Sequence, residues 1–532
     1  MANVIAATAP VELLNEDRYK NRYIIAAAVS LAAMLQVVDS SIVNVAIPTM
    51  MGTLGVSLDE ISLVSTTYII ASVIIIPMTG WLANVFGRKR YFAGSILLFT
   101  AASFLCGTAR SLEALVLWRI VQGIGGGALM ATSQAILYSS FPREETGTAM
   151  AFFGLGIMVG PTLGPTLGGW ITDNYSWPWI FYVNVPLGIL AALMVVAYVH
   201  DDESDGRSTR IDTLGILFLV LSVGALQFVL ERGEHYDWFD SGLILSLLIL
   251  GVLGTVMLVW RELTTANPVI EFRILKNLQY TAGTLFGIVV GAGLMGSVFV
   301  LPVFLQQILG MSALQTGMII LPGALATAGA MLVVGRLSAR FDNRVLILIG
   351  SLLFGASMWD LSKLTAMSGA GDLFIPLILR GFGLGLVFVP MTNLTLAQVK
   401  ISDLGQATGL NNFFRQMGGS FSIAMMANLL VHFTAEKKSA LAGHLSYFDP
   451  ATRARLGSIT NAMMSRGTDA TTAQQQALRI MDGMVARQAA VLSFEKVFLI
   501  SGAILVLALP LLLLFPTGHP TRRAPGGAAH AE

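Results

Sequence analysis

The segment GWLANVFGRKR, residues 80–90, ends a long apolar stretch with a glycine and a cluster of three basic residues. A similar segment, GRLSARFDNR, stands at 335–344, an offset of 255 residues. Two further pairs of segments repeat at offsets of 261 and 258 residues: LWRIVQGIGGG (117–127) with LILRGFGLGLVFVP (377–390), and GTAMAFFGLGIMVG (147–160) with GQATGLNNFFRQMGG (405–419). The near-constant offset predicts two repeated halves, an organisation typical of secondary transporters.

The composition is that of a membrane protein with many spans. Of the 532 residues, 55% are hydrophobic and only 12% are charged, whereas soluble domains carry about 25% charged residues. Apolar stretches of about 20 residues predict about 14 spans, centred near residues 35, 70, 98, 126, 158, 189, 221, 251, 292, 326, 353, 385, 418 and 504. Backbone groups in lipid must be hydrogen-bonded within the span, so we expect an all-α integral membrane protein.

The repeat and the spans together predict six, two and six helices. We expect an N-terminal six-helix bundle at 1–200, two extra transmembrane helices at 201–270, a C-terminal six-helix bundle at 271–516 and a tail at 517–532. Within the second bundle, the segment 434–491 is long, polar and rich in Ala and Gln, which predicts a partly helical outward loop. It is either an ordered external hairpin or a docking surface for another protein.

The distribution of Lys and Arg predicts the orientation in the membrane. These residues gather before the first span, in the even-numbered loops and in the tail, while the short odd-numbered loops hold only Arg110, Arg232 and Lys363. Cytoplasmic loops carry the excess of basic residues, so both termini are expected in the cytoplasm.

The sequence carries no signal for an enzyme. There is no Walker A loop, no HExxH motif and no nucleophile elbow in a suitable setting, so we expect no cofactor, no bound metal, no nucleic acid partner and no ATP-driven transport. A single cysteine, Cys106, excludes an intramolecular disulfide framework. The energy source that remains is an ion gradient across the bilayer.

An acid stands in the first apolar stretch, MLQVVDSSIVNVAIP (34–48), at Asp39. A charge at the centre of a span costs about 2.5 to 3.5 kcal/mol, so we expect it to face a cavity or a partner. Helical spacing places three polar residues on the same face, Gln36, Ser40 and Asn44. The opposite face is expected to resemble one that contacts lipid, and it holds Val38, Ile42 and Val45.

Arg119, in the fourth span, is the expected partner of Asp39. Counting residues from the ends of the two spans places both side chains at a similar depth. Arg119 shares its helix face with further residues that could line a cavity: Gln122, Met130 and Gln134. Coupling to Arg119 favours an ionised Asp39 and desolvation opposes it, so the pair is suited to proton exchange. The alternative is a static ion pair that locks two helices.

The second half is chemically unequal to the first. Arg380 is the counterpart of Arg119, but the first helix of this half, 279–309, has no acid in mid-span and carries Gln306 and Gln307 instead. Protonation chemistry is therefore expected in the N-terminal half. A second polar spot contains Asn411, Asn412 and Arg415, and it either lines the cavity or anchors a helix.

Glycines and prolines in the fifth span predict close helix packing, with bends at the prolines: Gly156, Gly160, Pro161, Gly164 and Pro165. Without a strand–turn–helix unit they do not form a nucleotide loop. We expect either a flexible or tightly packed helix at the seam between the halves or packing without a gating role. The basic segment supplies further conformational candidates, Gly80, Asn84, Gly87, Arg88 and Arg90, although the basic cluster also fits simple anchoring at the cytoplasmic surface.

These segments resemble those of the major facilitator superfamily, within it the 14-span drug:proton antiporters and especially EmrB-type pumps. The resemblance includes the basic segment at 80–90, the arginine motif at 117–127, the glycine–proline run at 154–169, the first helix around Asp39 and LQFVLERGEHYDWF at 226–239. It implies export of hydrophobic, cationic or amphiphilic toxic compounds in exchange for protons across a bacterial inner membrane. It also implies coupling roles for Asp39 and Arg119, a periplasmic membrane-fusion adaptor and an outer-membrane channel.

One departure from the family pattern is Asn84, which stands where the signature loop usually has an aspartate, so a charge relay through that position is in doubt. Alternatives to a multidrug exporter are a dedicated exporter of one metabolite such as a fatty acid or siderophore, a transport-silent membrane sensor and an importer, because the fold does not fix the direction of transport.

Overall fold

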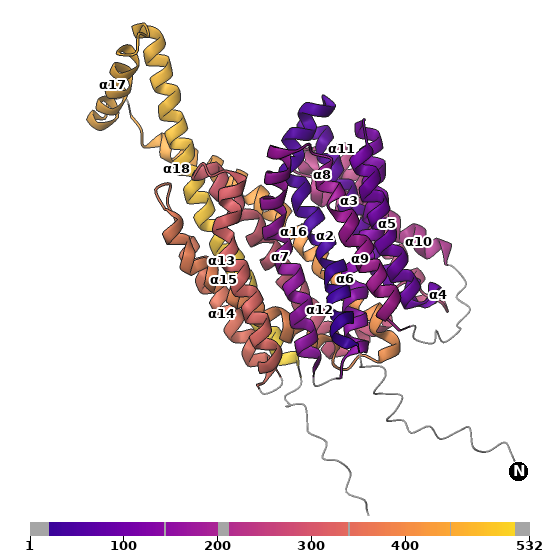
Figure 1. Ribbon diagram of the computed structural model, residues 1–532. Helices are drawn as coiled ribbons and strands as arrows, with labels where there is room; N and C mark the ends of the chain where they lie inside the picture. Colours follow the sequence, from indigo (N-terminus) through magenta and orange to yellow (C-terminus); the bar gives the residue numbers. More distant parts are fainter. Residues whose placement is uncertain (1–20, 143–144, 201–211, 339–340, 447, 516–532) are drawn as a thin grey trace, which may run out of the picture.

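The computed structural model describes residues 21–142, 145–200, 212–338, 341–446 and 448–515, and within them every regular element is a helix (Figure 1). The all-helical class predicted from the sequence is confirmed. The predicted tail at 517–532 lies outside the described residues, as do the first 20 residues and several basic loop positions used to predict the orientation.

The first half contains six long helical units, since α3, η1 and α4 follow one another directly and α8 leads into α9. Their bounds are α2 (Arg22–Leu54), α3 (Leu58–Ile75), η1 (Ile76–Met78), α4 (Thr79–Phe86), α5 (Arg88–Thr108), α6 (Leu112–Ser140), α7 (Thr146–Asn174), α8 (Trp179–Tyr182) and α9 (Asn184–Tyr198). Gly87 has a φ of +84°, which glycine adopts without strain, and it separates α4 from α5 in the basic segment.

Two extra helices follow, α10 (Thr213–Arg232) and α11 (Gly242–Thr264), joined through the short turn η3 (Trp238–Asp240). α10 bridges the two halves: Arg232 donates to the Ser62 hydroxyl of α3, and Gln227 Nε2 donates to Ser420 Oγ of α16 at 2.9 Å. The outer surface of α11 exposes a run of large apolar side chains, as expected for lipid contact: Leu245, Ile249, Leu253, Val256, Met257 and Trp260.

Asp212 anchors this helix pair at the start of α10. Its carboxylate accepts from Arg261 Nε at 2.9 Å, from Arg261 Nη2 at 3.1 Å and from the Gly215 amide at 3.1 Å. Burial by itself raises the pKa of Asp212, but these hydrogen bonds outweigh it and hold the pKa below its usual range.

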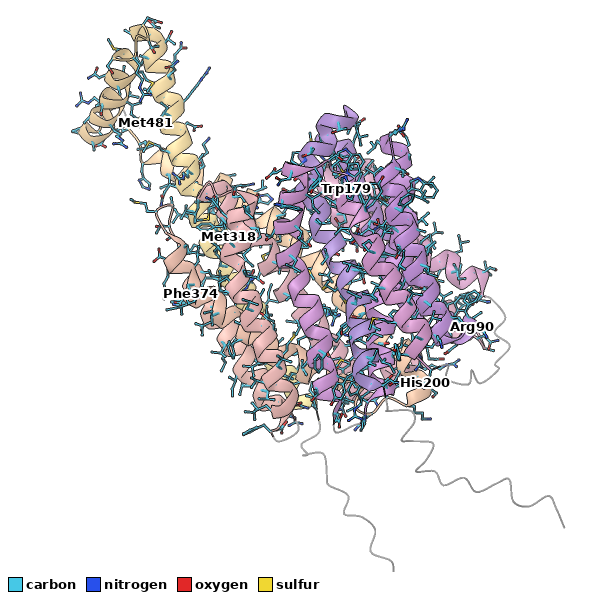
Figure 2. All side chains as sticks on the ribbon, viewed as in Figure 1. Arg90, Trp179, His200, Met318, Phe374 and Met481 are labelled. Atoms are coloured by element: carbon cyan, nitrogen blue, oxygen red, sulfur yellow. The ribbon has the colours of Figure 1, made fainter. Side chains whose placement is uncertain are left out.

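The second half contains α12 (Leu278–Val303), the π-helical turn η5 (Phe304–Ile308), α13 (Ala313–Leu337), α14 (Asn343–Leu361), α15 (Ala370–Leu396), α16 (Leu404–Gly443), α17 (Pro450–Met464), α18 (Ala470–Leu507) and η7 (Leu509–Leu514). The short turns η4 (Phe272–Lys276) and η6 (Ile401–Asp403) connect these helices to their neighbours. Segment 434–491 is largely helical: α16 and α18 extend beyond the bundle and α17 lies between them, apart from the other helices (Figure 1). Met481 of this extension lies at the opposite end of the molecule from Arg90 and His200 (Figure 2).

In the described part of the chain, 12 helical units are long and apolar enough to span a bilayer. Both extra helices, α10 and α11, are among them. The predicted spans near 158 and 418 correspond to α7 and α16, with 29 and 40 residues, which are not among the 12. A count of 14 spans therefore stays a prediction.

The two halves meet along two seams. α7 packs along α13, and α16 packs against η1, α4 and α6. At the second seam the backbones approach so closely that a Cβ on Gly80 would collide with the backbone of Gly405 and Gln406, and one on Gly409 would collide with the Ile76 carbonyl. A further apolar core joins both halves to the extra pair, through residues such as Trp81, Leu219, Leu258, Tyr280 and Leu410.

Candidate functional site

Asp39 and Arg119 form a fully buried ion pair at the centre of the first half. The side chains are 0% and 1% exposed, and Arg119 Nη1 lies 2.6 Å from Asp39 Oδ2. The other carboxylate oxygen, Oδ1, accepts from Gln122 Nε2 at 2.8 Å and from Asn184 Nδ2 at 2.9 Å. Helices α2, α6 and α9 thus converge on one carboxylate, and the pairing of Asp39 with Arg119 expected from their depths is present.

Arg119 is held on several sides. Its Nε donates to the Val64 carbonyl of α3 at 3.1 Å, and its Nη1 also lies 2.7 Å from Gln122 Oε1. The guanidinium carbon stands 4.0 Å from the ring centroid of Tyr68, a cation–π arrangement. These contacts place one positive charge where it both balances Asp39 and connects α6 to α3.

The geometry of this site is complementary to a carboxylate. Three side-chain donors point at the two oxygens of Asp39, whereas a protonated carboxyl would bring a donor of its own. These donors stabilise the ionised carboxylate, so a proton on Asp39 would weaken the hydrogen bonds from Arg119, Gln122 and Asn184. The arrangement has the elements of a proton-coupled switch, and it is equally compatible with a static helix lock.

Sequence reasoning missed two members of this site, Asn184 and Tyr68. Asn184 was detectable as the one polar residue in the apolar run FYVNVPLG (181–188), at the start of a span. Tyr68 gave no such signal, because tyrosine is common in apolar spans and only the rotation of α3 brings it under Arg119.

A second polar cluster lies where α6 of the first half meets the second half. Asn412 Nδ2 donates to Gln134 Oε1 at 2.6 Å, and Arg415 Nη2 contacts Met130 Sδ at 3.2 Å and the Asn412 side chain. The Arg415 guanidinium also stacks 4.9 Å from the Phe388 ring centroid. Four candidates from the sequence are thus brought together.

The remaining cavity candidates do not join either cluster. Asn44 is exposed and accepts from Ser65, Gln36 is half-buried, and Gln306 is exposed on the π-helical turn. Asn411 is buried next to its cluster neighbour, but its side-chain oxygen has no hydrogen-bond partner in the described residues. Arg380 lies between α12 and α15 and donates from Nη1 to the Ser297 carbonyl at 3.4 Å.

The glycines of the fifth span pack within the first half. Gly156, Gly160 and Gly164 each face α2, so that a Cβ on Gly160 would lie 2.7 Å from Val37 Cγ1. The seam with α13 uses other residues of α7, such as Gly147 and Gly154. The sequence predicted bends at the prolines of positions 161 and 165. In the structure, α7 continues as a helix through both positions.

This packing shows that the predicted lipid-like face of the first span is wrong. Val38 and Ile42 are buried, because α7 and its neighbouring helices cover that side of α2. In the basic segment, Asn84 and Arg90 are exposed, and Arg88 Nη1 donates to Ser139 Oγ of α6 at 3.2 Å. The segment thus connects α5 to the end of α6 and, through Gly80, touches the second half.

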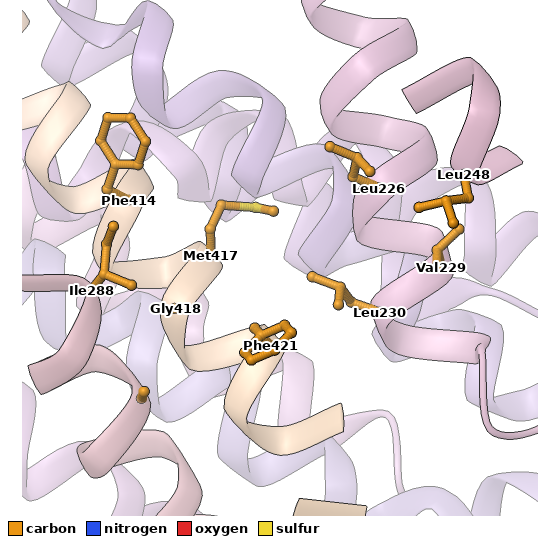
Figure 3. Close-up of a pocket in the computed structure, with 10 residues that line it drawn as sticks. Leu226, Val229, Leu230, Leu248, Ile288, Phe414, Met417, Gly418 and Phe421 are labelled. Carbon is orange, nitrogen blue, oxygen red and sulfur yellow. The ribbon is translucent and has the colours of Figure 1, made fainter. Parts of the chain in front are cut away.

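An apolar cavity of about 360 Å³ lies between the extra helix pair and the second half. In Figure 3, Leu226 and Leu230 of α10 point toward Met417 and Phe421 of α16 across this space. The cavity was not predicted, because its walls come from four helices and carry no polar side chain.

Known proteins resemble the chain over most of its length. The Major Facilitator Superfamily profile matches residues 29–423. The multidrug export protein EmrB of Haemophilus influenzae is 35% identical over 80% of this chain and 83% of its own length. The fatty acid resistance protein FarB of Neisseria gonorrhoeae is 29% identical over 94% of this chain and 97% of its own.

The fold is also that of solved structures. The proton:xylose symporter XylE superposes with a TM-score of 0.60 at 12% identity, covering 93% of this chain and 95% of the symporter. At that identity the likeness concerns the fold alone.

Proposed function

The chain belongs to the major facilitator superfamily, and we propose that it is a multidrug efflux transporter that exports hydrophobic and amphiphilic toxic compounds in exchange for protons. The similarity to a multidrug export protein supports the substrate class. The buried Asp39–Arg119 pair supports proton coupling and is the observation that carries this part of the proposal.

In the proposed cycle, Asp39 takes up a proton from the outward side and releases it inward. Protonation removes the charge that holds Arg119 at 2.6 Å and weakens the contact between α2 and α6. Because α6 also carries Met130 and Gln134 to the seam with α16, a shift of this helix changes the contacts between the halves. The proton gradient supplies the energy, and no cofactor takes part.

The proposal places the protein in a bacterial inner membrane with both termini in the cytoplasm. The helical extension formed by α17 and the adjoining parts of α16 and α18 then faces the periplasm. There it contacts a membrane-fusion adaptor that leads to an outer-membrane channel. Replacing 444–469 by a short Gly–Ser linker should abolish co-purification with the adaptor while the helix bundle still folds; co-purification of the shortened chain would contradict this part.

The multidrug function is tested in a bacterial host that lacks its own efflux pumps. Expression of the chain should lower the accumulation of several chemically unrelated dyes and toxicants, and collapse of the proton gradient should abolish the effect. If no compound is excluded, the multidrug function is wrong.

A dedicated exporter of one metabolite is the second candidate, favoured by the likeness to FarB. In the same accumulation assay, such a protein would exclude one class, for example fatty acids, and leave the dyes unaffected.

A further inference from the structure

The internal repeat places a second buried guanidinium where the first half has its ion pair. Arg380 follows Arg119 at an offset of 261 residues, and Ser297 follows Asp39 at an offset of 258. Both offsets fall within the range that relates the repeated segments. The structure agrees, because Arg380 of α15 donates to the carbonyl of Ser297 on α12, just as Arg119 of α6 contacts Asp39 on α2.

The two sites differ in charge balance. Arg119 has a carboxylate at 2.6 Å and further partners at Val64, Gln122 and Tyr68. Arg380 is only 7% exposed, and its contact in the described residues is a 3.4 Å hydrogen bond to a neutral carbonyl. No acid among those residues lies within ion-pair distance of it. A guanidinium has five N–H donors, so most of its binding capacity is unused.

A buried charge without a partner is costly, and an anion is what such a site binds best. We propose that Arg380 binds the anionic head group of exported amphiphiles, with a carboxylate taking the place that Asp39 occupies in the first half. This assignment rests on the proposed function and names the substrate class of the transporter.

The buried charges of the two halves also favour an anionic ligand. Asp39 and Arg119 cancel within the first half, whereas Arg415 contacts Met130, Asn412 and Phe388 and has no carboxylate at ion-pair distance in the described part of the chain. Among the described residues, Arg380 and Arg415 are thus two positive charges of the second half that no carboxylate balances. They attract an anionic amphiphile and disfavour a cation of the same shape.

The test uses the full-length protein in lipid nanodiscs and three probes of one shape: 2-naphthoate, neutral 2-naphthylmethanol and cationic 2-naphthylmethylammonium. Calorimetric titration, corrected with empty nanodiscs, gives each affinity without any transport. Wild type should bind naphthoate at least about tenfold more tightly than the alcohol, since hydrogen bonds between charged groups are about twice as strong as neutral ones.

Two substitutions that introduce side chains of equal size separate the effect of charge from the effect of bulk. Ser297→Asp supplies the missing counter-ion and should remove the preference for naphthoate, whereas Ser297→Asn adds the same bulk and should keep it within about threefold. Arg380→Gln should also remove the preference without adding bulk. The proposal is overturned if wild type shows no preference, if it binds no naphthoate, or if Ser297→Asp retains the preference.

A repeat with added sodium chloride separates an amphiphile site from a site for small inorganic anions. Chloride should reduce naphthoate affinity only modestly, and full displacement by chloride would contradict the assignment. This experiment separates failure of the binding site from failure of the proposed function. Selective binding of naphthoate without proton-dependent efflux in cells would refute only the transport function. Proton-dependent efflux without charge-selective binding would refute only the role of Arg380.

Discussion

The ion pair between Asp39 and Arg119 should contribute measurably to the free energy of unfolding, and a double-mutant cycle can determine how much. Arg119→Gln leaves a carboxylate that is 0% exposed without its counter-charge. Loss of one partner from a buried pair costs about 3–5 kcal/mol. Asp39→Asn should cost about 2–3 kcal/mol, at or below the low end of that range, because Arg119 keeps Gln122 Oε1 at 2.7 Å and the Val64 carbonyl at 3.1 Å.

The double variant Asp39→Asn/Arg119→Gln carries no buried charge, so it loses only hydrogen bonds. We expect a total of about 3 kcal/mol for it, against a sum of about 6 kcal/mol for the two single variants. The coupling energy is then about 3 kcal/mol, at the upper end of values measured for contacting residues.

The assay is equilibrium unfolding in mixed micelles of a mild detergent and dodecyl sulfate, followed by the fluorescence of the eight tryptophans. The exposed pair Lys363–Asp360, with a distance of 2.8 Å, provides a control cycle that should give at most about 1 kcal/mol. Additive single effects at Asp39 and Arg119 would refute the view that the two charges depend on one another.

Three further predictions concern the surroundings of this pair. Gly164→Leu should destabilise the protein by about 1–3 kcal/mol through overpacking against α2, while Gly169→Leu, where an added Cβ meets no atom within 4 Å, should be nearly neutral in thermal unfolding. Asn184→Leu removes a buried donor to Asp39 and should cost about 1–3 kcal/mol in the same unfolding assay, with a lower transport rate; unchanged transport would count against its role in the site. Because hydrogen bonds to Arg261 and Gly215 lower the pKa of Asp212 in the folded protein, its stabilising effect is present above about pH 4 and is lost as the pH falls further. Thermal unfolding of wild type, but not of Asp212→Asn, should therefore show a loss of stability below about pH 4.

The sequence predicted the depth of a residue along its helix better than the direction in which its side chain points around the helix axis. Counting residues along two helices placed Asp39 and Arg119 at one level, because the rise per residue of an α-helix is constant. It did not predict that Val38 is buried or that Asn184 joins the site, since these depend on which neighbour covers each side of a helix. The same limit applies to Gly160, whose spacing predicted close packing but not its partner α2.

The span count shows a related limit. Hydropathy gives a clear signal for α10 and α11 but not for α16, whose polar residues Asn412 and Ser420 are buried and bonded to other helices. Asn412 and Arg415 lower the apolar average of α16 because they take part in the seam with α6. Polar residues that join the two halves therefore lower the mean hydropathy of the helix that carries them, and that helix is harder to recognise as a span from its sequence.

Proton release on substrate addition tests the central claim most directly. Purified protein in detergent, in weakly buffered solution with a pH-sensitive dye, should release protons when a transported compound is added. Asp39→Asn should release none, and Asp360→Asn, which alters an exposed acid in α14, should release as many as wild type. Unchanged release from Asp39→Asn would show that the proton binds elsewhere and that the buried pair is a static lock.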